Sequence, residues 1–218
     1  MEPLLSEAQL MLRCKTIEGL TYSQLASTIQ HHIPSHPLQR KGWLGLAIET
    51  ALGANAGNSA IPDFMELGVE LKTLPINALG LPAESTFVTS IHLRKLHQQT
   101  WETSTCFQKL KRVLWILIED DVKLRFEHRR IGMAIMWSPN KEQTEILKND
   151  WSELSLMLSS GRLTEVHAGM GTYLQVRPKA QNSRSLCYGF DEQGEKISTT
   201  PRGFYLRTCL TRQIIKEL

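Results

Sequence analysis

The chain has 218 residues, enough for one large domain or for two lobes that share a core. Hydrophobic residues make up 41% and charged residues 22%, an ordinary globular composition that excludes a fibrous or largely disordered protein. The net charge of +3 permits nucleic-acid binding without requiring it, so any basic surface has to come from local clustering.

The sequence shows neither a secretory signal, nor a membrane-spanning segment, nor a pattern of paired cysteines. The chain starts MEPLLSEAQ, which lacks the basic segment and apolar stretch of a secretory signal. No apolar run approaches the roughly 20 residues that span a bilayer. The four cysteines are widely scattered and form no C-x-x-C pair: Cys14, Cys106, Cys187 and Cys209. We therefore expect a reduced cytoplasmic protein with free thiols and no membrane segment.

The first 55 residues predict helices. Ser6 is placed to cap a first helix, which Gly19 ends, and Thr21 with Gln24 forms a capping box for a second. A third helix is expected over residues 42–53, where apolar residues recur at helical spacing.

Two features of this helical region could carry chemistry. Glu49 falls at the edge of the apolar face of the third helix, where an unpartnered charge is costly. His31, His32 and His36 lie in the proline-containing loop before that helix. They could ligate a metal, but no cysteine or acidic partner stands at a useful spacing, so a solvated loop is the preferred interpretation.

A strand-rich region follows. Residues 68–74 predict one strand, and residues 86–91 predict its partner across a proline-containing turn. The segment VLWILI, residues 113–118, is almost continuously apolar, as expected of a central strand covered on both faces. Residues 131–137 predict a further strand.

The remaining residues predict a long helix and a β-rich end. The helix is expected over residues 140–160 and closes at Gly161. Two β-hairpins are expected around VHAGMGTYLQVRP and FDEQGEKI, followed by a strand over residues 203–207 and a short final helix. This order indicates an α/β protein, with a mixed sheet flanked by helices and an appended lobe.

The most informative motif is Ile61-Pro62-Asp63, then six residues, then Glu70-Leu71-Lys72. Side chains alternate along a strand, so Glu70 and Lys72 share one face while Leu71 faces the core. Asp63 enters from the preceding loop and can converge on Glu70. Two carboxylates and a backbone carbonyl suit Mg²⁺, and a lysine beside them can polarise an attacking water and offset phosphate charge. The motif therefore indicates phosphodiester hydrolysis.

The spacing of this motif alone is weak evidence, because D-x(n)-E-x-K is common by chance. The alternative is an exposed strand face with an ordinary Glu–Lys pair. Three features favour a nuclease. Pro62 completes the PD…ExK signature of restriction-type nucleases, the expected strands flank the motif, and Glu49 supplies a third carboxylate for a second metal or for positioning water.

Basic and aromatic residues interleave near the end of the chain. Arg177-Pro178-Lys179 and Pro201-Arg202-Gly203-Phe204-Tyr205 both lie at expected strand–loop junctions, where side chains can reach a DNA groove. Such mixtures are also common on solvated surfaces, and both interpretations stay open.

The chain resembles the MutH family, the methyl-directed strand-nicking endonucleases of DNA mismatch repair within the PD-(D/E)xK superfamily. The resemblance covers nearly the whole length and rests on these segments: KGWLGLAIE, PDF with LGVELKT, TWETS, KLKRVLW, YLQVRPKA and PRGFYL. It implies a restriction-endonuclease-like fold of two lobes around a DNA-binding cleft. Residues of about 1–110 would form the catalytic lobe, and about 111–218 would form the core strand, long helix and DNA-recognition lobe.

The same resemblance implies an activity and its partners. The expected reaction is incision 5′ to the guanine of GATC on the unmethylated strand of a hemimethylated duplex. Mg²⁺ would be the cofactor, with Mn²⁺ able to replace it. MutL would activate the enzyme, and MutS would act indirectly through MutL.

Three sets of residues are assigned by resemblance. Those expected in catalysis are Asp63, Glu70, Lys72, Glu49 in GLAIE and Lys109 in KLKRVLW. The metal ligands among them would be Asp63, Glu70 and Glu49. Those expected at DNA-recognition positions are Lys41 in KGW, Arg177 and Pro178 in VRPKA, and Tyr205 in PRGFYL.

Two other functions compete with this one. A GATC-cleaving type II restriction enzyme shares the fold and chemistry but needs two active sites for a double-strand cut. The chain holds one motif and no internal repeat, which favours a single nick by a monomer. A non-catalytic DNA-binding module with a decayed site is the other alternative, and the intact Asp63, Glu70 and Lys72 argue against it.

Overall fold

The computed structural model describes residues 4–57, 61–179 and 185–216, with the side chain of Lys41 left out. The chain divides into two compact units, each built from two separated segments. The first unit comprises Met1–Ala83 and Arg112–Ser138, and the second comprises Glu84–Lys111 and Pro139–Leu218. They are therefore not the successive lobes expected from the sequence, because the segment Arg112–Ser138 returns to the first unit.

The first unit begins with three helices, which are α1 (Glu7–Ile17), α2 (Tyr22–Thr28) and α3 (Pro37–Leu52). The side chain of Ser6 caps α1, and Thr21 with Gln24 forms the predicted capping box of α2, so both predicted starts are confirmed. Helix α3 begins at Pro37, earlier than the predicted residue 42. Proline fits the first turn, where its missing N–H has no helical partner, and Nδ1 of His36 accepts the N–H of Leu38 at 3.3 Å.

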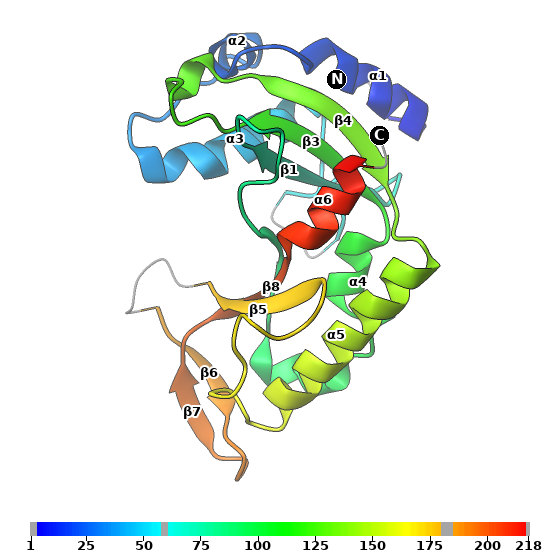
Figure 1. Cartoon of the computed structure of the whole chain (residues 1–218), viewed down its shortest axis with the longest axis vertical. Helices are drawn as coiled ribbons and strands as arrows, with labels where there is room; N and C mark the ends of the chain where they lie inside the picture. Colours follow the sequence, from blue (N-terminus) through cyan, green and yellow to red (C-terminus); the bar gives the residue numbers. More distant parts are fainter. Residues whose placement is uncertain (1–3, 58–60, 180–184, 217–218) are drawn as a thin grey trace. The chain divides into compact units, whose positions relative to one another are not determined.

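A mixed three-stranded sheet completes the first unit (Figure 1). Its strands are β1 (Glu70–Ile76), β3 (Val113–Glu119) and β4 (Ile131–Trp137), with the short helix η2 (Phe126–His128) between the last two. Strand β3 lies in the centre, as predicted, and pairs parallel with β1 and antiparallel with β4. Helices α1, α2 and α3 bury one face of this sheet in a shared core that includes Leu10, Leu25, Ile48, Leu71, Leu114 and Ile116.

The second unit contains two antiparallel sheets. One has the order β2 (Thr86–Ser90), β8 (Arg202–Leu206), β5 (Leu174–Pro178), and the other is the predicted hairpin of β6 (Cys187–Phe190) and β7 (Lys196–Thr199). Its helices are η1 (Leu93–Gln98), α4 (Thr105–Leu110), α5 (Lys141–Ser159) and α6 (Thr208–Lys216). No helix in the described part of the chain has the length and apolar composition of a membrane span.

Two predicted strand pairings are wrong. Residues 86–91 do not pair with β1, because β2 pairs with β8 and β1 pairs with β3. Pro75 in β1 lacks a backbone N–H, which suits the edge position that β1 occupies. The segment VHAGMGTYLQVRP forms one strand, β5, and not a hairpin, because residues before Leu174 form a turn whose N–H groups bind Asp150.

Candidate active site

Asp63 is brought to β1 by a tight loop. Phe64 and Val69 form an isolated antiparallel bridge, which folds the six residues between Asp63 and Glu70 back on themselves. Oδ2 of Asp63 then accepts the backbone N–H of Leu71 at 2.8 Å, and the Asp63 side chain is buried. The predicted approach of Asp63 to the motif strand is therefore present in the structure.

Glu70 and Lys72 point to the same face of β1, as strand alternation predicts. Nζ of Lys72 donates a hydrogen bond to Oε1 of Glu70 at 3.0 Å. The two residues are only 3% and 8% exposed. An ordinary solvated Glu–Lys pair would be far more exposed, so that alternative is excluded. Burying two charges costs desolvation free energy, which pairing only partly offsets. Buried charged groups of this kind are typical of functional sites.

The two β3 residues opposite this pair are apolar. In the parallel register Glu70 stands opposite Val113 and Lys72 opposite Trp115, and both of these β3 residues are fully buried. The ring of Trp115 contacts that of Trp137 edge-on, with centroids 6.2 Å apart. An environment of low polarity strengthens electrostatic interactions, so the charges of Glu70 and Lys72 act strongly on anything bound beside them.

Glu49 lies near the end of α3, next to the fully buried Ile48, and its side chain is half-buried. Its backbone carbonyl accepts the N–H groups of Gly53 and Ala54, which close the helix. Within residues 4–57, 61–179 and 185–216, no three histidine, cysteine or acidic side chains gather as a metal-binding group. The role of Glu49 as a third ligand stays a prediction.

The family resemblance implies two further lysines at the site. Lys109 is half-buried in the last turn of α4, which belongs to the second unit. The backbone of Lys41 lies in α3, and its side chain is outside the described part of the chain. Their roles in catalysis and DNA binding stay predictions.

Arg177 and Tyr205 come together on one face of the β2–β8–β5 sheet. Arg177 stands opposite Gly203 and Gln175 opposite Tyr205, so these side chains share a face. Cζ of Arg177 lies 5.9 Å from the centroid of the Tyr205 ring, and its Nη1 donates to Oγ of Ser85 at 2.6 Å. These contacts hold an exposed guanidinium in a defined orientation. Pro178 is exposed at the end of β5.

Two more residues lie on this face: Phe87, which the sequence did not indicate, and Lys179, which the sequence placed at a strand–loop junction. The ring of Phe87 lies edge-on to that of Tyr205, with centroids 5.3 Å apart, and Nζ of Lys179 lies 3.9 Å from the centroid of Phe87. Burial raises the pKa of Tyr205, partly offset by the positive charge of Arg177, and burial lowers the pKa of Lys179. Gly203 leaves room for both rings, because a Cβ there would lie 2.9 Å from Cε2 of Phe87.

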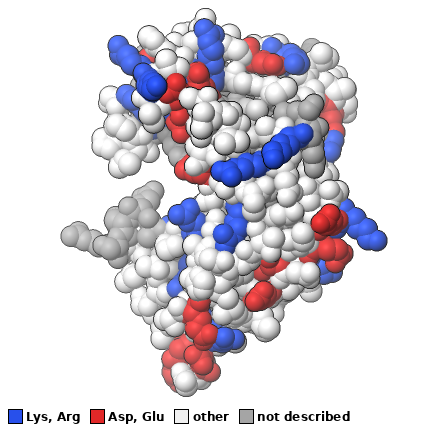
Figure 2. All heavy atoms as spheres, viewed as in Figure 1, with Lys and Arg blue, Asp and Glu red and all other residues white. Residues whose placement is uncertain are grey.

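We call the side chains of Phe87, Arg177, Lys179 and Tyr205 the recognition face. Sequence reasoning missed Phe87 because it assigned β2 to the wrong sheet. Charged side chains of both signs are interspersed over the surface visible in Figure 2, so basic character in this chain is local. A local cluster of two cations and two aromatic rings has the composition of a nucleic-acid contact.

Comparison with known proteins decides the family. Residues 52–150 match the model of the family described as DNA mismatch repair enzyme MutH. The DNA mismatch repair protein MutH of Pasteurella multocida (strain Pm70) is 44% identical over 212 residues, which cover 97% of this chain and 96% of that protein. The chain belongs to the MutH family.

Other MutH proteins match over the same extent. Those of Histophilus somni (strain 2336) and Vibrio campbellii (strain ATCC BAA-1116) are 44% and 42% identical over 211 and 210 residues. These alignments cover 97% and 96% of this chain, and 94% and 93% of the two relatives. The mixed sheet that carries Glu70 and Lys72 is thus the core of a restriction-endonuclease-like fold, as the resemblance implies.

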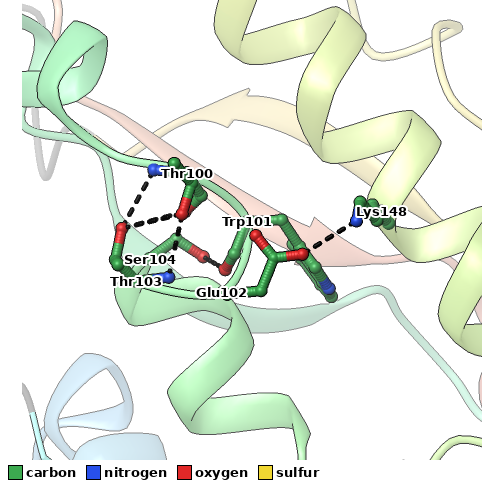
Figure 3. A network of polar contacts seen from close by, with 6 residues as sticks. All are labelled: Thr100, Trp101, Glu102, Thr103, Ser104 and Lys148. Atoms are coloured by element: carbon green, nitrogen blue, oxygen red, sulfur yellow. Dashed lines mark hydrogen bonds and ion pairs between the residues drawn. The ribbon is translucent and has the colours of Figure 1, made fainter.

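The MutH-like segment TWETS has a structural role (Figure 3). Oγ1 of Thr103 accepts the N–H of Thr100 at 2.9 Å, and Oγ of Ser104 accepts the N–H of Phe107, which caps α4. Glu102 pairs with Lys148 of α5 at 2.8 Å. The segment therefore fixes the start of the helix that carries Lys109.

Proposed function

We propose that this MutH-family chain is the endonuclease of methyl-directed mismatch repair and nicks the unmethylated strand of hemimethylated GATC sites, 5′ to the guanine. The observation that carries the proposal is the buried Glu70–Lys72 pair on β1, with Asp63 bonded to the same strand. The relatives, whose names identify them as DNA mismatch repair proteins, support the same activity.

Mg²⁺ fits the donor set of this centre. Asp63 and Glu70 offer carboxylate oxygens, which are the ligands that Mg²⁺ prefers, and no soft thiolate stands in the motif. Their two negative charges and the positive charge of Lys72 sum to one negative charge, which a divalent cation complements. Mg²⁺ or Mn²⁺ held there would supply Lewis acidity toward the phosphate and the attacking water. Glu49 is the candidate for a further oxygen ligand.

The side chains of the centre supply positioning and charge. In the hydrolysis, a water oxygen bonds to phosphorus and the bond from phosphorus to the 3′ oxygen breaks. The ammonium of Lys72, oriented by Glu70, stabilises the negative charge that grows on the phosphate oxygens. Because Lys72 is almost fully buried, this stabilisation is stronger than a solvated lysine could give.

The recognition face would read the DNA sequence and its methylation. The guanidinium of Arg177 has the planar fork that pairs with O6 and N7 of guanine in the major groove. The ring of Tyr205 would lie where a methyl group on adenine N6 needs space. Lys179 and Lys41 would contact phosphates, which adds affinity without sequence preference.

The proposed oligomeric state follows from the single motif, and the proposed partners follow from the family resemblance. One PD…ExK motif without a repeat gives one incision, so we propose that the chain acts as a monomer and makes a nick. Activation by MutL, with MutS acting through MutL, is part of the same proposal.

A plasmid assay tests the proposal. Supercoiled, unmethylated plasmid with GATC sites is incubated with the chain and Mg²⁺, and Glu70→Gln is the matched control. We expect open circles to accumulate before any linear DNA, and no conversion with Glu70→Gln. Linear DNA as the first product would indicate a double-strand cutter, and unchanged supercoiled plasmid that is nevertheless bound would indicate a non-catalytic module.

A further inference from the structure

The turn that precedes β5 is held from one side by Asp150 of α5. Oδ1 of Asp150 accepts the N–H of Thr172 at 2.8 Å, and Oδ2 accepts those of Tyr173 and Leu174 at 2.7 and 2.8 Å. Asp150 is only 6% exposed. Three charge-assisted hydrogen bonds compensate for the burial of this carboxylate, and together they fix three consecutive residues of the chain.

Arg207 holds the same turn from the other side. Its Nη2 donates to the carbonyl oxygens of Ala168 and Met170 at 2.6 and 2.8 Å, and its backbone N–H donates to Tyr173 at 2.8 Å. Gly171 between them has a φ of +79°, and a Cβ there would lie 1.9 Å from the carbonyl oxygen of Leu174. The turn therefore has one closely specified backbone conformation.

We call the contacts of Asp150 and Arg207 with this turn the clamp. The clamp lies at the end of the β5–β8 pair where Leu174 stands opposite Leu206. Leu174, bound by Asp150, is the first residue of β5 and pairs with Leu206, the residue before Arg207. The same register places Arg177 beside Tyr205. A slip of one residue would turn Arg177 to the opposite face of the sheet. Fixing the register at one end of the strand pair thus fixes the recognition face at the other.

We propose that Asp150 and Arg207 are positioning residues for DNA recognition, which set the register in which β5 and β8 present Arg177 and Tyr205. This inference rests on the proposed function of the recognition face. Neither residue reads DNA itself. Loss of the clamp should therefore reduce sequence discrimination more than it reduces the rate of phosphodiester cleavage.

Asp150→Asn is the primary test variant. It keeps the size of the side chain and one acceptor oxygen, but it turns an NH₂ group toward a backbone N–H. Arg207→Lys is the second variant, because it keeps the charge but places its ammonium one bond nearer the backbone than Nη2, the atom that donates to both carbonyl groups. Glu153→Gln is the matched control, since it removes the same charge from an exposed position of α5.

The measurement is the ratio of nicking rates at GATC and at sites with one altered base pair, with Mg²⁺ present. Circular dichroism at the assay temperature confirms that each variant is folded, and hydrogen exchange follows the amides of β5. We expect Glu153→Gln to keep the wild-type ratio. Asp150→Asn and Arg207→Lys should lower the ratio at least tenfold and deprotect the amides of β5.

Three outcomes separate the possible failures. A folded Asp150→Asn that slows nicking equally at every sequence, or that keeps the wild-type ratio and the protection of β5, overturns the inference. If Asp150→Asn does not fold, a wild-type ratio in Arg207→Lys overturns it. A wild-type chain that nicks DNA without preference for GATC overturns the proposed function instead. In that case the hydrogen exchange still tests the clamp, and unchanged protection of the β5 amides in the variants rejects its role in fixing the strand register.

Discussion

The ammonium nitrogen of Lys72 lies 3.0 Å from Oε1 of Glu70 on one face of β1, and both side chains are almost excluded from solvent. Asp63 is bonded to the same strand through the N–H of Leu71. On the adjacent strand, the apolar residues Val113 and Trp115 stand opposite the pair. Charged groups are thus held where their burial costs desolvation free energy. Removal of one of them should therefore change both stability and activity.

Lys72→Ala should lower the nicking rate about 100- to 1000-fold, because it removes a donor that stabilises charge on the phosphate. It should also destabilise the metal-free chain by about 3 kcal/mol, since the buried carboxylate of Glu70 loses its hydrogen bond from Lys72. Nicking kinetics and urea unfolding measure the two effects. Lys15→Ala, which breaks the exposed pair with Glu18, is the control and should change stability by less than about 1 kcal/mol. Activity of Lys72→Ala within a few-fold of wild type contradicts its assignment.

Metal substitution should separate binding from cleavage. Mg²⁺ and Mn²⁺ should support nicking, whereas Ca²⁺ should support specific DNA binding without hydrolysis, because its coordination is longer and looser. Each ion should raise the thermal midpoint of the wild-type chain and raise it less in Glu70→Gln. Calorimetry and nicking assays after EDTA treatment check this. Nicking that persists in EDTA would place the catalytic centre elsewhere.

Arg177→Ala should cost about 1–3 kcal/mol of discrimination against altered GATC sites, equivalent to about 5- to 150-fold. Arg177→Lys should restore little of this loss, because lysine lacks the planar fork. Binding to matched and altered duplexes over a range of salt concentrations measures the effect. Arg125→Ala is the control, since its side chain is 78% exposed in the first unit. An equal loss of affinity for matched and altered duplexes, with a weaker dependence of that affinity on salt concentration, would show that Arg177 is a phosphate contact.

Tyr205 is the candidate sensor of adenine methylation. Tyr205→Ser should narrow the difference in nicking rate between hemimethylated and fully methylated GATC, because it removes the ring that competes with the methyl group for space. Tyr205→Phe should keep most of the difference, since the edge-on contact with Phe87 and the contact with Arg177 need only the ring. A folded, active Tyr205→Ser with the wild-type preference would exclude Tyr205 as the sensor.

Features encoded in a few adjacent residues could be predicted from the sequence. The helix caps at Ser6 and Thr21 and the long helix before Gly161 depend on local hydrogen bonds and helical periodicity, and they are confirmed. The shared face of Glu70 and Lys72 follows from strand alternation alone, so it could be predicted as well.

Features that depend on distant pairing could not be predicted. Strand β2 pairs with β8, so that Phe87 stands beside Tyr205, and no local pattern around residue 87 encodes that partner. The sequence around residues 166–173 predicts a strand where the structure has a turn, because the acceptor that holds the turn, Asp150, lies on another element. Lys41 and Lys109 entered the site through the family resemblance, since their spacing in the chain carries no geometric signal. Glu49 was proposed from its position at the edge of the apolar face of a helix.

Strand-resolved cleavage of one duplex tests the central claim most directly. A duplex with a single GATC site carries a different fluorophore on each strand and is prepared unmethylated, hemimethylated on either strand, and fully methylated. With Mg²⁺, and with Glu70→Gln as the inactive control, we expect incision 5′ to the guanine on the unmethylated strand only. The cut should move to the other strand when the methyl group does, and the fully methylated duplex should stay intact. Equal cutting of both strands in the hemimethylated duplexes, or cleavage of fully methylated DNA at the same rate, would contradict the claim.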